Sequence, residues 1–200
     1  MRNAHGETLL QAEHAALLPR QRLLKAVAWS FVPATLVLFL SGPLPLLFPV
    51  PVHRMLHLAG ALLFLGNVLV GAVWLALADA SGSVPTLRFA TRVINVADLA
   101  LTAPGALLAL LNGAALANAW GGLFGAPWLV RSLALFGAIT CLWAFILVPL
   151  QLKLENTVAT LPDDAPRLPP PLRRALIAYF VLGGLTAALS AAIGAIMVLK

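Results

Sequence analysis

The chain has 200 residues, of which 61% are hydrophobic and only 10% are charged, and its mean hydropathy is +0.95. A soluble domain carries about 25% charged residues, so the composition excludes a water-soluble globule and predicts an all-α, polytopic protein embedded in the lipid bilayer. The net charge of +6 does not indicate a nucleic-acid partner, because the basic residues flank hydrophobic segments, where they set topology and meet anionic lipid headgroups.

Residues 1–25 are polar and are expected to form a cytoplasmic N-terminal segment, in which the stretch from Glu7 to Lys25 has the composition of an amphipathic helix. No small-residue cleavage site follows the first apolar run, so a secretory signal peptide is not expected. Residues 26–200 are expected to form a single transmembrane bundle.

Five apolar segments follow, each long enough to cross a bilayer as a helix. They lie at about 26–48, 55–78, 89–117, 128–151 and 175–199. The first contains Pro33, Pro43 and Pro45, which predict a kinked or re-entrant end. The longest connection, 152–174, is rich in Pro and Asp and is expected to be a cytoplasmic loop.

Lys and Arg are unequally divided between the two sides that these spans define. One side would hold Arg54, Arg131 and Lys200, and the other Arg2, Arg20, Arg22, Lys25, Arg88, Arg92, Lys153, Arg167, Arg173 and Arg174. Because cytoplasmic loops are enriched in basic residues, this division predicts a cytoplasmic N-terminus and an external C-terminus. We expect a multi-pass protein of the bacterial inner membrane.

Polar and small residues recur on one face of the second segment, at alternating steps of four and three. They are His53, His57, Gly60, Phe64, Asn67, Gly71 and Trp74. This spacing is typical of a helix face packed against other helices rather than lipid. Asn67 would lie about 15 Å deeper than His57 at 1.5 Å per residue.

A similar stripe runs along the third segment, through Arg92, Asn95, Asp98, Thr102, Gly105, Ala109 and Asn112. Because the connection between the two segments is short, we expect them to be antiparallel neighbours. Asn67 and Asp98 would then meet near the middle of the membrane. Residues 60–67 (GALLFLGN) and 105–112 (GALLALLN) also share a pattern, which is either a relic of a repeated helix pair or a coincidence in a sequence rich in Ala and Leu.

Asp98 is the one acidic residue deep inside an apolar segment. An ionised carboxylate there costs on the order of 3 kcal/mol on insertion scales, so it must be neutral or paired. One hypothesis makes it a proton-accepting group or a cofactor partner. The other makes it an interhelical hydrogen-bonding group, with Asn67, Asn95 or Arg92 as its partner.

His57 suits an axial haem ligand or a metal ligand, because an imidazole in an apolar bundle can serve as either. The alternative is a histidine bonded to a neighbouring carbonyl or to Asn112. His53 lies four residues before His57, a spacing that lets two imidazoles share one ion such as copper. It also lies just outside the apolar run, where a solvated helix-start residue is the simpler expectation.

Two further features carry structural expectations. Cys141 has no second cysteine to pair with and is expected to be a small buried thiol. The small residues Gly183, Ala187, Ser190 and Gly194 form a face suited to close helix packing. No phosphate-binding loop, dinucleotide-binding fingerprint, zinc-protease motif or serine-nucleophile elbow is present in the sequence, so soluble-type enzymology is not indicated.

Three stretches carry a resemblance to a known family: RMLHLAGALLFLGN, FATRVINVADLALTAPGALLALLNG and LWAFILVPLQLKL. They resemble the bacterial predicted integral membrane proteins grouped as domain of unknown function 2269, over about residues 53–155. The most telling motifs are the Leu-His pair, the Gly-Asn pair, the Arg-Asp-Thr-x-Pro-Gly run and the late Pro-x-Gln. This resemblance implies the fold and no assigned activity.

More distantly, the chain is similar to the copper-resistance D proteins and to the small-membrane-type protoporphyrinogen oxidases. In the latter, a histidine on the corresponding helix is associated with haem b, which would make His57 the axial ligand. Those oxidases pair the histidine with an intramembrane lysine. Here Lys25, Lys153 and Lys200 all lie at helix ends, so oxidase activity is not expected.

The sequence therefore leaves two classes of function open. The first is a haem-b-binding protein, redox-associated or tetrapyrrole-related, with His57 as ligand and Asn67, Arg92 and Asp98 orienting the group or balancing its charge. A second imidazole would come from another copy of the chain or from another membrane subunit. The second class is a non-catalytic membrane subunit or scaffold, or a periplasm-facing copper handler that uses His53 and His57.

Overall fold

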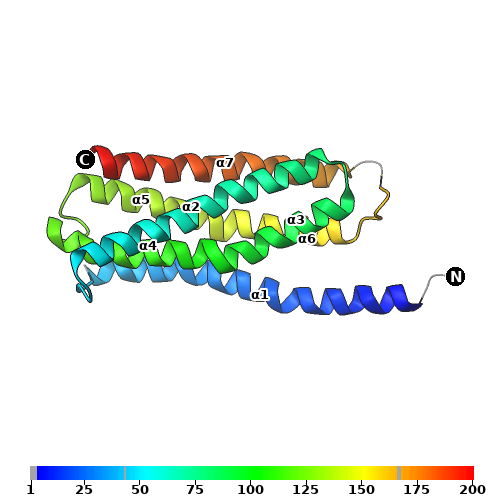
Figure 1. The fold of residues 1–200 in the computed structure, drawn as a ribbon, viewed down its shortest axis with the longest axis horizontal. Helices are drawn as coiled ribbons and strands as arrows, with labels where there is room; N and C mark the ends of the chain where they lie inside the picture. The colour runs from blue at the N-terminus through cyan, green and yellow to red at the C-terminus, as the bar shows by residue number, and fades with distance from the viewer. Residues whose placement is uncertain (1–3, 43, 166–167) are drawn as a thin grey trace.

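The computed structural model describes residues 4–42, 44–165 and 168–200, with side chains described from Pro19 onward. Its described residues form helices and no strand (Figure 1). In order these are α1 (Ala4–Ser41), α2 (Val50–Ala80), α3 (Val84–Ala97), η1 (Asp98–Thr102), α4 (Ala103–Leu116), η2 (Ala117–Trp120), α5 (Pro127–Leu142), η3 (Trp143–Leu147), α6 (Val148–Ala159) and α7 (Pro170–Leu199). Five helical stretches are long and apolar enough to span a membrane, which confirms the predicted five-helix bundle.

Several boundaries differ from the prediction. The polar N-terminal segment is helical and continuous with the first span, and α1 continues through Pro33. It ends at Ser41 rather than near 48, because Gly42 takes a φ of 81° that breaks the helix. At the other connection, α6 extends to Ala159 and α7 begins at Pro170, so the expected loop 152–174 is mostly helical.

Two spans contain a π-helical turn, and a proline explains each. Pro104 and Pro149 lack an N–H, so the carbonyl four residues before each cannot make its usual helical bond. The chain widens instead, and the Ala103 N–H bonds to the Asp98 carbonyl, while the Val148 N–H bonds to the Trp143 carbonyl. Such turns recur at functional sites. Here they make up η1 and η3, which face each other across the bundle.

Helices α2 and α4 approach closely where Gly60 meets Gly105. A Cβ on Gly60 would lie 2.5 Å from the Ala109 nitrogen and 2.6 Å from the Gly105 oxygen. A Cβ on Gly105 would lie 2.8 Å from the Phe64 nitrogen and 2.9 Å from the Gly60 oxygen. Backbone therefore packs directly on backbone, as in small-residue contacts between membrane helices.

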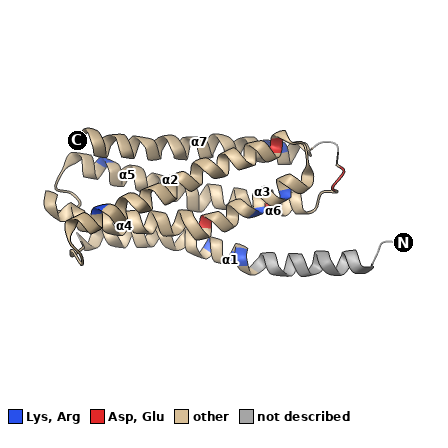
Figure 2. Ribbon diagram, viewed as in Figure 1, with Lys and Arg blue, Asp and Glu red and all other residues tan. Residues whose placement is uncertain are grey.

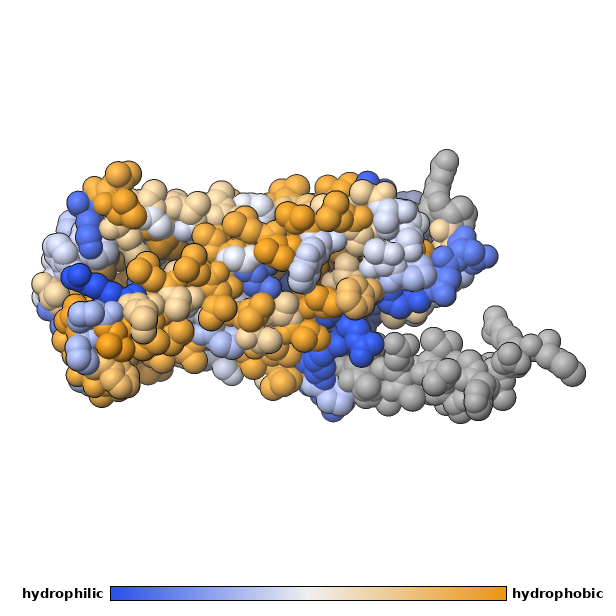
Figure 3. All heavy atoms as spheres, in the orientation of Figure 1, coloured by the Kyte–Doolittle hydropathy of each residue, from blue (hydrophilic) through white to orange (hydrophobic). Residues whose placement is uncertain are grey.

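The outer surface is that of a membrane protein. Few charged residues lie along the length of the bundle (Figure 2), and the face in Figure 3 is mainly hydrophobic between its ends. Leu58, Leu62, Leu69 and Val73 of α2 are each at least half exposed, which places them toward lipid. Cys141 is also exposed, so the prediction of a buried thiol is wrong: its helix turns that position outward.

We call the end where α1 carries Arg20 and where α7 begins the basic end, and the opposite end, where α2 begins, the histidine end. Arg88, Lys153 and Arg173 share the basic end, as the sequence predicts. The positive-inside rule predicts that the basic end faces the cytoplasm.

A buried ion pair fixes α1 to the bundle at the basic end. Glu155 of α6 is 2% exposed and pairs with Arg20 of α1. It also accepts hydrogen bonds from Gln21 Nε2 at 3.2 Å and from Asn95 Nδ2 at 2.8 Å. Three helices therefore meet at one carboxylate.

Replacing Glu155 with Ala is expected to lower the free energy of unfolding by about 3–5 kcal/mol, because it leaves a partly buried guanidinium and a buried amide without their acceptor. Asp163 provides the control, since its ion pair with Arg88 is exposed. Asp163→Ala is expected to cost at most about 1 kcal/mol. Unfolding in mixed detergent measures both, and equal losses would contradict the anchoring role of Glu155.

Candidate functional site

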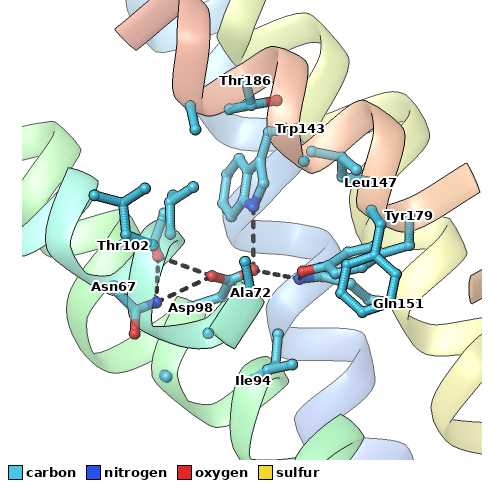
Figure 4. A pocket seen from close by; sticks show the side chains of 18 of the residues that line it. Asn67, Ala72, Ile94, Asp98, Thr102, Trp143, Leu147, Gln151, Tyr179 and Thr186 are labelled. Carbon is cyan, nitrogen blue, oxygen red and sulfur yellow. Dashed lines mark hydrogen bonds between the residues drawn. The ribbon is translucent and has the colours of Figure 1, made fainter. Parts of the chain in front are cut away.

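A single carboxylate, Asp98, is the centre of the polar groups in the middle of the bundle (Figure 4). Its side chain is 5% exposed. It accepts hydrogen bonds from four neutral donors, each of which lies on a different helical segment. Oδ1 accepts from Thr102 Oγ1 at 2.8 Å and from Asn67 Nδ2 at 3.4 Å. Oδ2 accepts from Gln151 Nε2 at 2.8 Å and from Trp143 Nε1 at 3.2 Å.

Such an arrangement stabilises the ionised form of a carboxyl group. Both oxygens accept hydrogen bonds, and hydrogen bonds to a charged acceptor are about twice as strong as neutral ones. These bonds offset part of the cost of holding a charge inside a membrane. Among the described residues, no Lys, Arg or His forms an ion pair with Asp98. A negative charge on Asp98 is therefore stabilised by hydrogen bonds and not by an ion pair of the described residues.

Gln151 links the carboxylate to Tyr179 of α7. Its Nε2 also donates to the Tyr179 hydroxyl oxygen at 3.0 Å, which leaves the tyrosine O–H free to donate elsewhere. The Gln151 Oε1 atom is buried and has no hydrogen-bond partner in the described structure. A buried acceptor without a partner costs about 1–3 kcal/mol, so this site has unused capacity for a donor.

A cavity of about 190 Å³ lies against these groups, between α2, η1, η3 and α7. Its polar wall is formed by Asn67, Asp98, Thr102, Gln151 and Thr186. The rest is mainly apolar and includes five aromatic side chains: Phe64, Trp74, Trp143, Tyr179 and Phe180. We call this space the Asp98 cavity.

The small-residue face of α7 does not pack closely, contrary to the prediction. A Cβ added at Gly183 or Gly194 would meet no atom within 4 Å. Gly183 lines the Asp98 cavity and Gly194 lines a second one, because α7 diverges from α2 toward the histidine end (Figure 1). The small side chains keep this space open instead of filling it.

His53 is buried rather than solvated, so that prediction is wrong. It is 4% exposed because the chain before α2 folds over it, and the Phe48 ring packs 5.8 Å from the imidazole, centre to centre. The Phe48 N–H donates to Nε2 at 3.2 Å, so Nδ1 carries the proton and donates to Asn112 Oδ1 at 2.7 Å. Nδ1 thus holds α2 to α4, and Nε2 holds the chain that precedes α2.

His57 has the opposite character. Its Nδ1 donates to the Ala109 carbonyl at 2.7 Å, so Nε2 carries a lone pair, and no donor of the described residues bonds to it. The ring lines a second cavity of about 190 Å³, mainly apolar, between α2, α4, α5 and α7. A backbone carbonyl on one nitrogen is the usual support for a histidine that binds metal through the other.

The shared sequence pattern of α2 and α4 has a structural counterpart. Asn67 lies seven residues after Gly60 and bonds to Asp98, seven residues before Gly105. Asn112 lies seven residues after Gly105 and bonds to His53, seven residues before Gly60. The helix pair is therefore locally two-fold symmetric about its glycine contact, which favours the repeated-pair hypothesis over coincidence.

The site agrees with the sequence hypotheses in part. Asn67 and Asp98 meet as predicted, whereas Arg92 is exposed and Asp98 takes its hydrogen bonds from other residues. Asp98 and His57 line different cavities, separated by Phe64.

The sequence did not predict three residues of the site, Trp143, Gln151 and Tyr179, although Gln151 belongs to the Pro-x-Gln motif. No three His, Cys, Asp or Glu side chains of the described chain cluster as a metal ion would require.

Five apolar spans around a buried polar centre define a multi-pass integral membrane protein. The chain belongs to the family of predicted integral membrane proteins DUF2269, whose model matches residues 51–200. Comparison with curated proteins and with solved structures gives no match. The matched region contains every residue of the Asp98 centre.

Proposed function

We propose that the protein binds a positively charged ligand within the membrane, with Asp98 as the counter-charge. The observation that carries this proposal is a carboxylate that accepts hydrogen bonds on both oxygens, has no cationic partner among the described residues, and lines a cavity. A ligand cation would supply the missing charge at low dielectric, where a charge pair interacts far more strongly than in water.

The competing hypothesis makes Asp98 only a structural link between helices. Its donors come from α2, η1, η3 and α6, so the link is real. A purely structural carboxylate, however, has no need of an adjoining cavity or of a neighbouring acceptor without a partner. The first hypothesis requires the negative charge of Asp98, and the second requires only its hydrogen bonds.

Trp143 provides a built-in reporter, because its Nε1–H bonds to Asp98. Titration of the protein in lipid nanodiscs with butyltrimethylammonium is expected to change the Trp143 emission, obtained as the difference from Trp143→Phe. The neutral isostere 2,2-dimethylhexane is expected to cause no change. Equal responses to the cation and the neutral molecule would overturn the proposal.

His57 favours a second candidate, haem b binding. The observation is the Nε2 lone pair, held in place by the Nδ1–H bond to Ala109 and facing an apolar cavity. His57 would hold the iron, and haem b would supply one-electron chemistry when bound. A second imidazole would come from another copy or a partner subunit.

Haem-supplemented, detergent-purified protein is expected to show a Soret band that His57→Ala removes. His57→Ala also loses one hydrogen bond, so its helical circular dichroism serves as the control for folding. A Soret band of the same intensity in His57→Ala would contradict the assignment. Copper has less support, because both ring nitrogens of His53 are already engaged, with Phe48 and Asn112, and His53 would have to give up one of these bonds to share an ion with His57.

A further inference from the structure

Three cavities follow one another along α2 and α7, from the Asp98 centre to the histidine end. The Asp98 cavity and the second cavity share Phe64 as a common wall. The second cavity and a third one, of about 510 Å³, share His57, Gly113, Leu129 and Met197. From Asn67 to His57 this path runs about 15 Å along α2 at 1.5 Å per residue.

The Asp98 cavity is better suited to an organic ammonium than to a metal ion. Hard metal cations require about six oxygen ligands and favour clustered carboxylates, whereas the one carboxylate of this cavity is already bound by four donors, and no three His, Cys, Asp or Glu side chains of the described residues cluster there. Its aromatic side chains attract cations through their ring faces. A weakly hydrated alkylammonium gains from such a wall, and its own surface is apolar.

The second cavity is suited to a hydrocarbon chain. Its walls include Ala61, Leu65, Leu133, Ile193 and Met197, and it contains no acidic residue. Its open space depends on Gly194, where an added Cβ would meet nothing. A chain could therefore leave the Asp98 cavity past Phe64 and lie between α2 and α7.

We infer that the ligand is a long-chain alkylammonium whose cationic head lies at Asp98 and whose chain follows the second cavity toward the histidine end. This inference rests on the proposed function and adds the class of ligand and its direction. Charge complementarity with Asp98 places the cationic head, and the order of the cavities along α2 and α7 places the hydrocarbon chain.

A dodecyltrimethylammonium with a photoreactive diazirine at the end of its chain tests the inference in lipid nanodiscs. After illumination, mass spectrometry locates the adducts. We expect them on the walls of the second cavity, on α5 and on α7 from Ser190 to Met197, with loss of these adducts in Asp98→Asn. Excess butyltrimethylammonium is expected to displace them.

Gly194→Leu separates this inference from the proposed function. A leucine there fills the second cavity without a backbone clash, so the adducts on its walls are expected to disappear. The Trp143 response to butyltrimethylammonium is expected to persist, because the Asp98 cavity does not include Gly194. Gly66→Leu is the matched control: that glycine also has open space around it and lines neither cavity.

Adducts confined to lipid-facing residues such as Leu62 and Val73, and unchanged in Asp98→Asn, would overturn the inference. If the Trp143 response to the short cation survives in that case, the proposed function stands and only the placement of the chain falls. If that response is also independent of Asp98, both fall.

Discussion

Asp98→Asn is expected to remain folded and to lose the cation-dependent change in Trp143 emission. The amide oxygen keeps the bonds from Thr102 and Asn67, and a flipped Gln151 amide presents its free Oε1 to the new NH₂ group. The charge is gone, however. A quaternary ammonium has no N–H and is attracted to Asp98 by its charge alone, so loss of the carboxylate charge should raise the dissociation constant about 10- to 100-fold.

Asp98→Leu provides the contrast. It removes the acceptor for Thr102, Gln151 and Trp143 and leaves buried donors without a partner. The free energy of unfolding should therefore fall by about 1 kcal/mol or more for each of these donors. Measured side by side, the two variants separate charge from structure. If Asp98→Asn binds butyltrimethylammonium as tightly as the unmodified protein, the carboxylate has only a structural role.

Replacing Gly60 is expected to have the largest effect on folding. Its Cβ position lies 2.5 Å from the Ala109 nitrogen, so even Gly60→Ala must push α2 away from α4. Overpacking of this kind costs about 1–3 kcal/mol. Separation of the helices also weakens the His53–Asn112 and Asn67–Asp98 bonds, so Gly60→Leu is expected to prevent accumulation of folded protein.

Gly66→Ala, on the same helix, is the matched control, since its Cβ position has no neighbour within 4 Å. Replacement of a helical glycine by alanine there should be neutral or stabilising by up to about 1 kcal/mol. Thermal unfolding in detergent compares the variants. A Gly60→Ala protein as stable as Gly66→Ala would show that the two backbones are not in contact.

The sequence was sufficient for the parts of the fold that the membrane dictates. Five spans follow from the lengths of the apolar runs, and the stripe from His53 to Asn67 follows from helical spacing, since lipid is a poor neighbour for imidazole and amide groups. The meeting of Asn67 with Asp98 followed from the antiparallel arrangement of two spans joined by a short connection.

The fourth span was harder to interpret, for a physical reason. In an ideal helix, residues eight apart such as Trp143 and Gln151 differ by about 80° around the axis, so regular spacing does not place them on one face. The π-helical turn before Pro149 changes that register, and both side chains reach Asp98. A proline inside a span, such as Pro149, indicates that the helix departs from regular geometry, but it does not indicate which residues form the widened turn.

His53 and the small-residue face of α7 were misjudged because neither depends on its own helix alone. His53 is covered by the irregular chain that precedes α2, whose path no periodicity encodes. Gly183 and Gly194 have the composition of a close helix contact, but the direction of α7 relative to α2 leaves cavities there. Composition permits close approach, and neighbouring helices decide whether it occurs.

Reaction with a membrane-soluble carbodiimide tests most directly whether Asp98 is a carboxyl group reachable from the membrane. Such a reagent adds to the protonated fraction of a carboxyl group and rearranges to a stable N-acylurea, which mass spectrometry locates. A bound cation holds the carboxylate in its ionised, unreactive form. In lipid nanodiscs we expect an adduct on Asp98, formed more slowly when butyltrimethylammonium is present. Absence of an adduct on Asp98, or the same rate with and without the cation, would contradict a cation site in this cavity.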